Sequence, residues 1–348
     1  MIKAFLYVPV FVLTFFGVEI FRRWSRKRNI LDVPNERSSH IAPTPRGGGL
    51  IIGIVCLSVF FGYCSIFQAE IYFSYFIGAI IIVLISWLDD LFSVSVFWRF
   101  LCHGLSAFLI VWSLGYWETI YLPFAGTIHL GQFGIVFTIL WIVWMINAYN
   151  FMDGIDGIAA IQAVTGGIGW LVIGILSGIE TAGFYGGVIA FSSLGFLIHN
   201  WQPAKIFMGD VGSAFLGFSF AALPLLAKNE RPEDVSFLPL LPLIAISLVW
   251  LFLFDTVLTF FRRIFKGEKV WQAHRGHIYQ KLVISGYSHQ FVSVLYGITS
   301  FLTIIFLIYA LQPDSNSTGS LFFLMVFQAL GILCVLYFSK SRTNLNNR

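Results

Sequence analysis

The chain has 348 residues, of which 58% are hydrophobic and 11% are charged, and its formal net charge is +4. Ordinary soluble domains carry about a quarter charged residues, and no soluble core could bury this much Phe, Ile and Leu. The composition therefore excludes an ordinary soluble domain and predicts an all-α polytopic protein whose helices cross a lipid bilayer. All four cysteines lie in apolar runs without a CxxC spacing, so we expect neither a disulfide framework nor a thiolate metal site.

Apolar runs near bilayer-spanning length predict about eleven transmembrane helices. In chain order, these runs lie near residues 4–21, 48–67, 71–88, 99–116, 133–150, 158–178, 182–199, 212–227, 237–259, 291–311 and 320–338. The first run is not a good cleavable signal peptide, because a basic cluster follows it instead of preceding it and a small-residue cleavage site is missing. The sequence shows no internal repeat or separate soluble region, so we expect residues 1–348 to form a single membrane domain.

The distribution of Lys and Arg predicts how the chain is oriented in the membrane. With the amino terminus outside, the inside segments hold 18 of the 21 Lys and Arg residues; these segments are 22–46, 89–99, 200–211, 260–290 and the tail 339–348. Because basic residues concentrate on the cytoplasmic side, we expect a cytoplasmic carboxyl terminus. Structure outside the membrane is expected only in the two longest inside loops.

Four groups of polar residues lie at or near the ends of predicted spans, all on the inside face. Asp89 and Asp90 end the third span; Asn147, Asn150, Asp153 and Asp156 end the fifth; Phe207 to Ser213, with Asp210, open the eighth; His274, Arg275 and His277 follow the ninth. Carboxylates at membrane depth are costly and therefore mark functional sites by default. We expect one shared site at the cytoplasmic face of the membrane.

Each group also has a purely structural interpretation. Asp89 and Asp90 could form a solvated helix end, but two adjacent carboxylates are unfavourable at the negative end of a helix, so a functional role is favoured. Asp210 could equally well be the N-cap of the eighth helix, where Asp is a preferred residue. The histidines and Arg275 after the ninth span are also typical of a basic inside loop, and each of them alone fits that interpretation.

Two glycines and three further histidines complete the polar inventory. Gly154 and Gly157 follow the aspartates of the fifth group and weaken a helix there, which indicates a place where the backbone approaches a phosphate closely. His103, His129 and His199 are isolated from other polar residues in the sequence. We interpret these three histidines as structural.

Several carboxylates and an asparagine on one membrane face need cations in order to coexist. Oxygen ligands of this kind suit Mg²⁺, which pairs one or two carboxylates with substrate phosphates, and nearby Arg and His supply charge for phosphate oxygens. Metal, phosphate and membrane face together indicate phosphoryl transfer to a lipid. The alternative from another class is a transporter or channel, but transporter sites lie near the bilayer midplane, often on broken helices in paired repeats, whereas these carboxylates lie at helix ends.

These motifs resemble the polyprenyl-phosphate N-acetylhexosamine-1-phosphate transferase superfamily, also called glycosyltransferase family 4. The matching segments are Arg37-Ser-Ser-His40, Pro43-Thr-Pro-Arg-Gly-Gly-Gly49, Asp89-Asp90, Asn147-Ala-Tyr-Asn-Phe-Met-Asp-Gly-Ile-Asp-Gly157, Phe207-Met-Gly-Asp-Val-Gly-Ser213 and the His-rich loop. They run from residue 37 to 282 in the family's order, and the family's number of spans matches as well. The ordered set is far more specific than any one of these motifs.

The resemblance implies a role for each motif residue. Asp210 would ligate Mg²⁺ (with Mn²⁺ as a substitute), Asn150 would be a second ligand, and Asp89 or Asp90 would deprotonate or orient the lipid phosphate. Phe207 would stack on the uracil of a UDP-sugar, and Asp153 and Asp156 would lie beside the nucleotide. The loop residues His274, Arg275 and His277 would contact diphosphate or sugar. The implied reaction is attack of that lipid phosphate on the sugar-proximal phosphorus, with release of UMP. A two-step route through a covalent aspartyl intermediate stays open.

Two departures from the muramyl-pentapeptide branch narrow the resemblance. That branch carries a His-His-His run, whereas this chain has His274-Arg-Gly-His277, and residues 200–207 also resemble the O-antigen type. The chain is therefore nearer to the O-antigen and enterobacterial-antigen initiators, whose donors are UDP-N-acetylhexosamines, such as GlcNAc, or 6-deoxy relatives, such as FucNAc and QuiNAc. By resemblance, the acceptor is undecaprenyl phosphate and the location is the bacterial inner membrane. No nucleic-acid partner is expected, and a homodimer and a muramyl-type donor stay open as alternatives.

Overall fold

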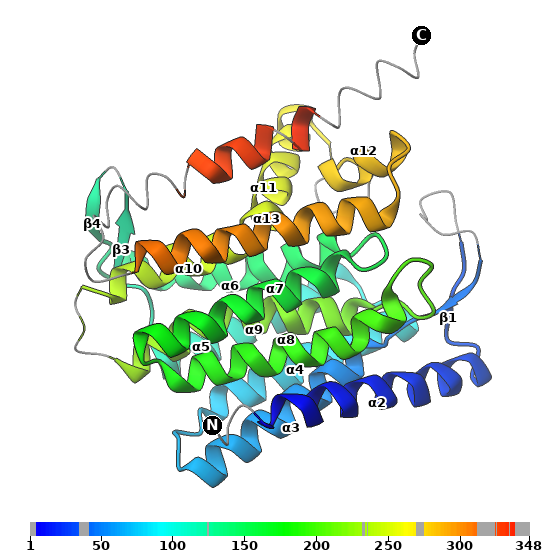
Figure 1. Cartoon of the computed structure of the whole chain (residues 1–348), viewed down its shortest axis with the longest axis horizontal. Helices are drawn as coiled ribbons and strands as arrows, with labels where there is room; N and C mark the ends of the chain where they lie inside the picture. Colours follow the sequence, from blue (N-terminus) through cyan, green and yellow to red (C-terminus); the bar gives the residue numbers. More distant parts are fainter. Residues whose placement is uncertain are drawn as a thin grey trace.

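The computed structural model is a bundle of long helices that lie roughly side by side (Figure 1). It describes residues 5–34, 42–123, 125–231, 234, 236–268, 275–311, 324, 326–333 and 335–337. The helices are α2 (Tyr7–Lys27), α3 (Gly49–Phe67), α4 (Phe73–Phe92), α5 (Val96–Leu114), α6 (Phe133–Met152), α7 (Ile158–Ser177), α8 (Glu180–Asn200), α9 (Asp210–Glu230), α10 (Leu241–Leu248), α11 (Trp250–Phe265), α12 (Ile278–Ile284) and α13 (His289–Ala310), with a 3₁₀ turn η1 at Leu238–Leu240. This architecture confirms the all-α polytopic class.

The number of membrane-spanning helices differs from the expectation. Within the described ranges, eight helices are long and apolar enough to cross a membrane, or nine if one bent pair counts as a single span. The eight are α3 to α9 and α13. Helix α2 covers the first predicted run but carries Glu19 and a basic carboxyl end, and the last predicted run holds a shorter apolar helix, Val326–Tyr337. The count of about eleven spans is therefore not confirmed.

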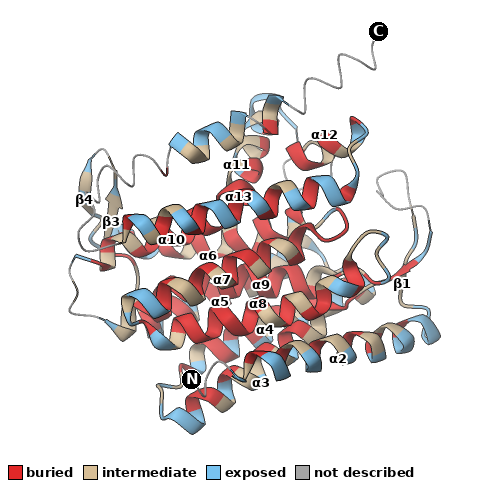
Figure 2. Cartoon of the chain, in the orientation of Figure 1, coloured by how far each residue is buried: buried red, intermediate tan, exposed pale blue. Residues whose placement is uncertain are grey.

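Helix α9 forms the centre of the bundle. In its apolar stretch 94% of the residues are buried, against 22% for α5, and α9 packs against α3, α4, α6 and α8. Figure 2 shows buried residues concentrated on these central helices and exposed ones on the outer faces of α2 and α13. Small residues permit the close packing: a Cβ added to Gly49 would lie 2.2 Å from the Gly212 Cα. The first residue of this central helix is Asp210. The packing of α9 against its four neighbouring helices therefore fixes the position of Asp210.

The ninth predicted span, 237–259, is broken into two helices. The segments Leu238–Leu248 and Trp250–Phe265 meet at an angle of 77°, so two helices replace the single helix that the sequence predicts. A break inside a membrane leaves backbone carbonyls that need new partners. Gln162 on α7 donates to the Leu248 carbonyl at 2.8 Å, and Ser300 on α13 donates to the Gln162 side-chain oxygen at 2.9 Å. Two neighbouring helices therefore stabilise the bend.

Two short antiparallel hairpins lie at opposite ends of the bundle (Figure 1). Strands β1 (Leu31–Asp32) and β2 (Thr44–Pro45) pair within the first inside loop, as expected. Strands β3 (Thr119–Leu122) and β4 (Gly126–His129) pair in a loop that the sequence places outside, so the expectation that only inside loops hold structure was wrong. The β-branched and aromatic residues of β3 favour a strand, and Gly126 with φ +74° permits the turn.

Candidate active site

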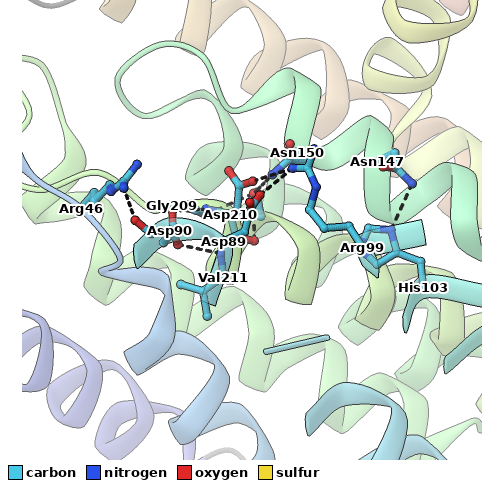
Figure 3. A network of polar contacts seen from close by, with 11 residues as sticks. Arg46, Asp89, Asp90, Arg99, His103, Asn147, Asn150, Gly209, Asp210 and Val211 are labelled. Atoms are coloured by element: carbon cyan, nitrogen blue, oxygen red, sulfur yellow. Dashed lines mark hydrogen bonds and ion pairs between the residues drawn. The ribbon is translucent and has the colours of Figure 1, made fainter. Parts of the chain in front are cut away.

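The candidate site lies where α4, α6 and α9 end or begin next to one another (Figure 3). Asp89 and Asp90 occupy the last turn of α4, Asn150 the last turn of α6, and Asp210 the first position of α9. The structure therefore brings together residues that are 120 positions apart in the chain. Helix direction explains the meeting: α4 and α6 run toward this face of the bundle, and α9 starts from it.

Asp90 caps the amino end of α9 from a different helix. Its Oδ1 accepts from the Asp210 backbone N–H and its Oδ2 from the Val211 N–H, both at 3.1 Å. Gly209 precedes them with φ +77°, and a Cβ there would lie 2.6 Å from the Asp90 Oδ2, so only glycine fits without a shift. The interpretation of Asp210 as the cap is therefore wrong, because Asp90 performs that task and leaves the Asp210 carboxylate for another one.

Asp89 and Asp210 meet at a single arginine. The Arg99 Nη1 lies 2.6 Å from the Asp89 Oδ2 and 3.5 Å from the Asp210 Oδ2. The side chains of Arg99 and Asp210 are 31% and 37% exposed, against 10% for Asp89, so this part of the site opens to solvent. Arg99 belongs to none of the sequence motifs, although it is the single Lys or Arg in the inside loop 89–99.

Asn150 connects α6 to the first turn of α9. Its amide Nδ2 donates to the Ser213 Oγ at 3.1 Å, and the same side chain is hydrogen-bonded to the Asp210 carboxylate. Asn147, one turn earlier, points away from this group, since its amide contacts the Val143 carbonyl and the His103 ring (Figure 3). The two asparagines of the motif therefore have different surroundings, and only Asn150 reaches the carboxylates.

Asp153 lies just beyond α6, in the short loop before α7. Burial, together with the negative charges of Asp210, Asp90 and Asp156, raises the pKa of the Asp153 carboxyl well above its usual range. The largest part of this pKa shift comes from burial, and the rest from repulsion between Asp153 and the neighbouring carboxylates. A bound cation would relieve that repulsion.

The carboxylate of Asp156 contacts other groups of the protein. Its Oδ2 accepts from the Ala204 backbone N–H at 3.0 Å, and its Oδ1 lies 3.4 Å from the His289 Nδ1. Next to it, the Gly157 N–H donates to the Asn200 side chain at 2.9 Å. These contacts connect the loop between α8 and α9 to the loop between α6 and α7. Both carboxylate oxygens of Asp156 thus have partners within the protein. A place for Asp156 beside the nucleotide stays a prediction.

Phe207 is held at the site by backbone pairing with the first glycine-rich segment. The Phe207 N–H donates to the Pro45 carbonyl at 2.8 Å, and the Gly48 and Gly49 N–H groups donate to the carbonyls of Phe207 and Met208 at 3.0 and 2.9 Å. The Phe207 ring is half-buried. Arg46, in the same segment, donates to the Asp90 carbonyl. The segments 37–40 and 269–274, with His274, lie outside the described residues.

His277 lies directly before α12 and against the end of α6. Its ring is 3% exposed, with its centroid 6.3 Å from that of Phe151, while Arg275 is exposed nearby. The hydroxyl of Tyr279 donates to the Phe151 carbonyl at 3.0 Å, and it occupies the space that a side chain at Gly154 would need. The close approach expected at Gly154 is thus made by Tyr279, and the structure gives no reason to assign it to a phosphate.

The chemistry of these residues fits Mg²⁺. Within the described part of the chain, no three His, Cys, Asp or Glu side chains are arranged to hold a metal ion by themselves. Mg²⁺ rarely needs such a cage, because it binds one or two carboxylates and completes its shell with water and substrate phosphates. Asp210, more than a third exposed beside Asn150 and Asp89, offers oxygen ligands of this type.

Fold and site together define a polytopic membrane protein with an acidic site at its helix ends. Residues 72–228, which contain the carboxylates from Asp89 to Asp210, match the model of glycosyl transferase family 4. The "Probable undecaprenyl-phosphate N-acetylglucosaminyl 1-phosphate transferase" of Bacillus subtilis is 31% identical over 288 residues, which cover 79% of this chain and 75% of the relative. The chain therefore belongs to glycosyl transferase family 4, as its motifs predict.

Two further groups of relatives carry similar names. The decaprenyl-phosphate N-acetylglucosaminephosphotransferase of Mycobacterium leprae is 29% identical over 314 residues, covering 82% of this chain and 77% of the relative. The undecaprenyl-phosphate alpha-N-acetylglucosaminyl 1-phosphate transferase of Salmonella typhimurium is 27% identical over 308 residues, covering 83% and 78%. The similarity thus extends well beyond the acidic site to most of both chains.

Proposed function

We propose that this enzyme transfers an N-acetylhexosamine 1-phosphate, GlcNAc or a 6-deoxy relative, from a UDP-sugar to undecaprenyl phosphate and releases UMP. The observation that carries the proposal is the meeting of Asp89, Asp210 and Arg99 at the helix ends, within a chain whose relatives are named as polyprenyl-phosphate GlcNAc-1-phosphate transferases. The product would be the first lipid-linked sugar of an O-antigen or another surface polysaccharide, made at the cytoplasmic face of the bacterial inner membrane.

The reaction forms one phosphorus–oxygen bond and breaks another. An oxygen of the lipid phosphate attacks the sugar-proximal phosphorus, and the bond to UMP breaks. Asp210 and Asn150 would hold Mg²⁺, which supplies positive charge to the diphosphate oxygens when it is bound. Asp90 acts indirectly, because its two hydrogen bonds hold the start of α9 and thereby place Asp210.

Arg99 is the residue best suited to the lipid phosphate. Its guanidinium is partly exposed and is fixed by a short ion pair with Asp89. A phosphate monoester is already largely ionised near neutral pH, so it needs a cation to approach these carboxylates more than it needs a base. In this proposal Asp89 orients the acceptor through Arg99, and it removes no proton.

The donor would lie on the side of Phe207, Asp153 and His277. The half-buried Phe207 ring would stack on uracil, and Asp153 lies close enough to Asp210, Asp90 and Asp156 for their charges to act on it. The loop with Arg275 and His277 supplies donors for diphosphate and acetamido oxygens. The names of the relatives support GlcNAc, and the absence of a His-His-His run in the sequence argues against a muramyl-pentapeptide donor.

A donor panel tests the proposal directly. Purified protein receives undecaprenyl phosphate, Mg²⁺ and one UDP-sugar at a time, and released UMP and lipid-linked product are both measured. We expect turnover with UDP-GlcNAc or a 6-deoxy UDP-N-acetylhexosamine. Turnover of the muramyl-pentapeptide donor alone would overturn the donor assignment, and no turnover of any UDP-sugar would overturn the reaction.

The cytoplasmic position of the site has its own test. Lys205→Cys and Glu268→Cys, each in a background without the native cysteines, place single thiols on exposed residues of the inside loops. We expect no labelling of either thiol by a membrane-impermeant reagent added outside intact cells, and full labelling after permeabilisation. Labelling from outside would contradict the orientation.

A further inference from the structure

Another buried carboxylate, Asp255, lies away from the acidic site, on the helix that follows the bend. Asp255 is 0% exposed and belongs to α11, where it directly follows five apolar residues. A carboxylate in such surroundings is stable only if hydrogen bonds compensate for the lost water. The hydrogen-bond partners of Asp255 therefore indicate which part of the structure it stabilises.

The partners of Asp255 belong mainly to the start of α12. Both carboxylate oxygens accept from the Ile278 backbone N–H at 2.9 Å, and one also accepts from the Tyr279 N–H at 3.2 Å. The His277 Nδ1 lies 3.1 Å from the other oxygen. The hydroxyls of Thr259 and Tyr296 donate at 3.1 and 3.3 Å and complete the set. One carboxylate thus fixes three consecutive residues.

This arrangement determines the state of the His277 ring. An ionised carboxylate can only accept, so its contact with the ring favours the tautomer whose proton is on Nδ1. The Nε2 atom then lies on the opposite side of the ring from Asp255. The ring plane is further restricted by Phe151 and Tyr279, whose ring centroids lie 6.3 and 5.8 Å away.

The same short helix is attached to the acidic site by Tyr279. Its hydroxyl donates to the carbonyl of Phe151, the residue that follows Asn150, and it fills the space left by Gly154 next to Asp153. A displacement of α12 would therefore be transmitted to both His277 and the end of α6. Asp255 connects the helix after the bend to the residues around the proposed donor.

We propose that Asp255 is a positioning residue that acts through His277 in the use of the UDP-sugar. The inference rests on the proposed function, since it assigns His277 to the donor. It predicts that the two residues behave as one unit in donor kinetics, and that their loss affects donor kinetics more than acceptor kinetics.

A double-mutant cycle tests this unit. Asp255→Asn, His277→Ala and the double variant are compared in kcat and KM for UDP-sugar and for lipid phosphate. We expect Asp255→Asn to lower kcat/KM for the donor on the order of 10- to 100-fold, the usual effect of removing a group that orients a histidine. In the His277→Ala background it should cost less than about 2-fold, as expected for coupled residues. Losses that multiply would overturn the inference.

Thr256→Val is the matched control. Thr256 follows Asp255 on α11 and is equally buried at 3% exposure, but its hydroxyl returns to the Phe252 carbonyl of its own helix. We expect donor kinetics like those of the wild type. A donor-specific loss as large as that of Asp255→Asn would assign the effect to the packing of α11 and overturn the inference.

A spectroscopic measurement covers the case in which Asp255→Asn does not fold. Nitrogen-15 spectra of ring-labelled histidine in the wild-type protein, assigned with His277→Ala, report which nitrogen of His277 carries the proton. We expect a protonated Nδ1, and an unprotonated Nδ1 would overturn the inference. If the wild type turns over no UDP-sugar, the proposed function fails by itself, and this spectrum still tests the contact with Asp255.

Discussion

Polar side chains of the bundle core are neutral and hydrogen-bonded to one another, whereas those of the acidic site are charged. In the core, the hydroxyls of Tyr75, Tyr185 and Ser219 bond one another, and those of Thr14 and Ser192 do the same at 2.9 Å. All five residues are fully buried and neutral. Such pairs satisfy the hydrogen-bonding groups of neighbouring helices and add stability without adding charge.

The acidic site has an excess of negative charge instead. Asp89, Asp90, Asp153 and Asp210 lie close together, and one nitrogen of Arg99 serves two of them. A protein selected for stability alone would avoid this arrangement, because like charges raise the free energy of the folded state. From this difference we infer that the surplus of negative charge serves to bind a cation and, through it, phosphates. Substitutions in the two regions should therefore affect different measurements.

The largest effect is expected at Asp210. Asp210→Asn should lower turnover by about 10³-fold or more, since it removes a charged oxygen ligand where charge develops in the transition state. The protein should still insert and should melt at or above the wild-type temperature, because Asp90 supplies the cap of α9 and one negative charge of the site is removed. Turnover and melting temperature are measured on the same preparation. Near-normal activity at ordinary Mg²⁺ would show that Asp210 has no functional role.

The neighbours Asp89 and Asp90 should separate activity from stability. Asp89→Asn breaks the ion pair with Arg99, so we expect about 10²-fold lower turnover, chiefly through the lipid phosphate, with an unchanged melting temperature. Asp90→Ala removes both cap hydrogen bonds and should destabilise the protein by about 1–2 kcal/mol. Equal stability losses in both variants would contradict this division of roles.

The core prediction concerns the bend between α10 and α11. Gln162→Leu leaves the Leu248 carbonyl and the Ser300 hydroxyl without their partner, which should destabilise the protein by about 1–3 kcal/mol. Because the hydrogen bonds of Gln162 go to Leu248 and Ser300 and not to the acidic site, KM for the lipid phosphate should stay the same. Ser65→Ala, an exposed residue whose hydroxyl returns to its own helix, is the control and should change neither quantity. A changed KM with normal stability would argue against the separation of the two regions.

The smallest effect should be a gain of stability at Asp153. A carboxyl whose pKa is raised in the folded protein stabilises it below the unfolded value of about 3.9, and this contribution is lost as pH rises through the folded pKa. Asp153→Asn is neutral at every pH. In metal-free protein it should therefore melt higher than the wild type at neutral pH, on the order of 2 °C, while the difference disappears below about pH 4. An equal or lower melting temperature at neutral pH would contradict the excess of negative charge.

The helices and the meeting of the motifs could be predicted from the sequence because each depends on local pattern. Apolar runs give spans, and carboxylates stand out against them. The bend at Leu248 could not be predicted in this way, since Gln162 and Ser300 on two other helices stabilise it. For the same reason, the sequence left capping of α9 open as a role of Asp210, whereas Asp90, 120 positions earlier, caps this helix.

Two residues were missed although the sequence carries a signal for each. Asp255 interrupts an apolar span, and an ionisable residue there is a functional hypothesis by default. Arg99 is the single basic residue of a loop that begins with two aspartates. Neither belongs to a recognised motif, and their partners, His277 and Asp210, are distant in the chain. Tertiary pairing, which one sequence does not reveal, distinguishes them from ordinary loop and span residues.

Binding of one divalent cation at the helix ends is the central claim, and Mn²⁺ allows it to be measured without turnover. The paramagnetic resonance signal of free Mn²⁺ is titrated with protein in the presence of UDP-GlcNAc, for the wild type, Asp210→Asn and Gln162→Leu. We predict one bound Mn²⁺ per chain in the wild type and in Gln162→Leu, and at least about 10-fold weaker binding in Asp210→Asn. Equal binding by Asp210→Asn would contradict the account.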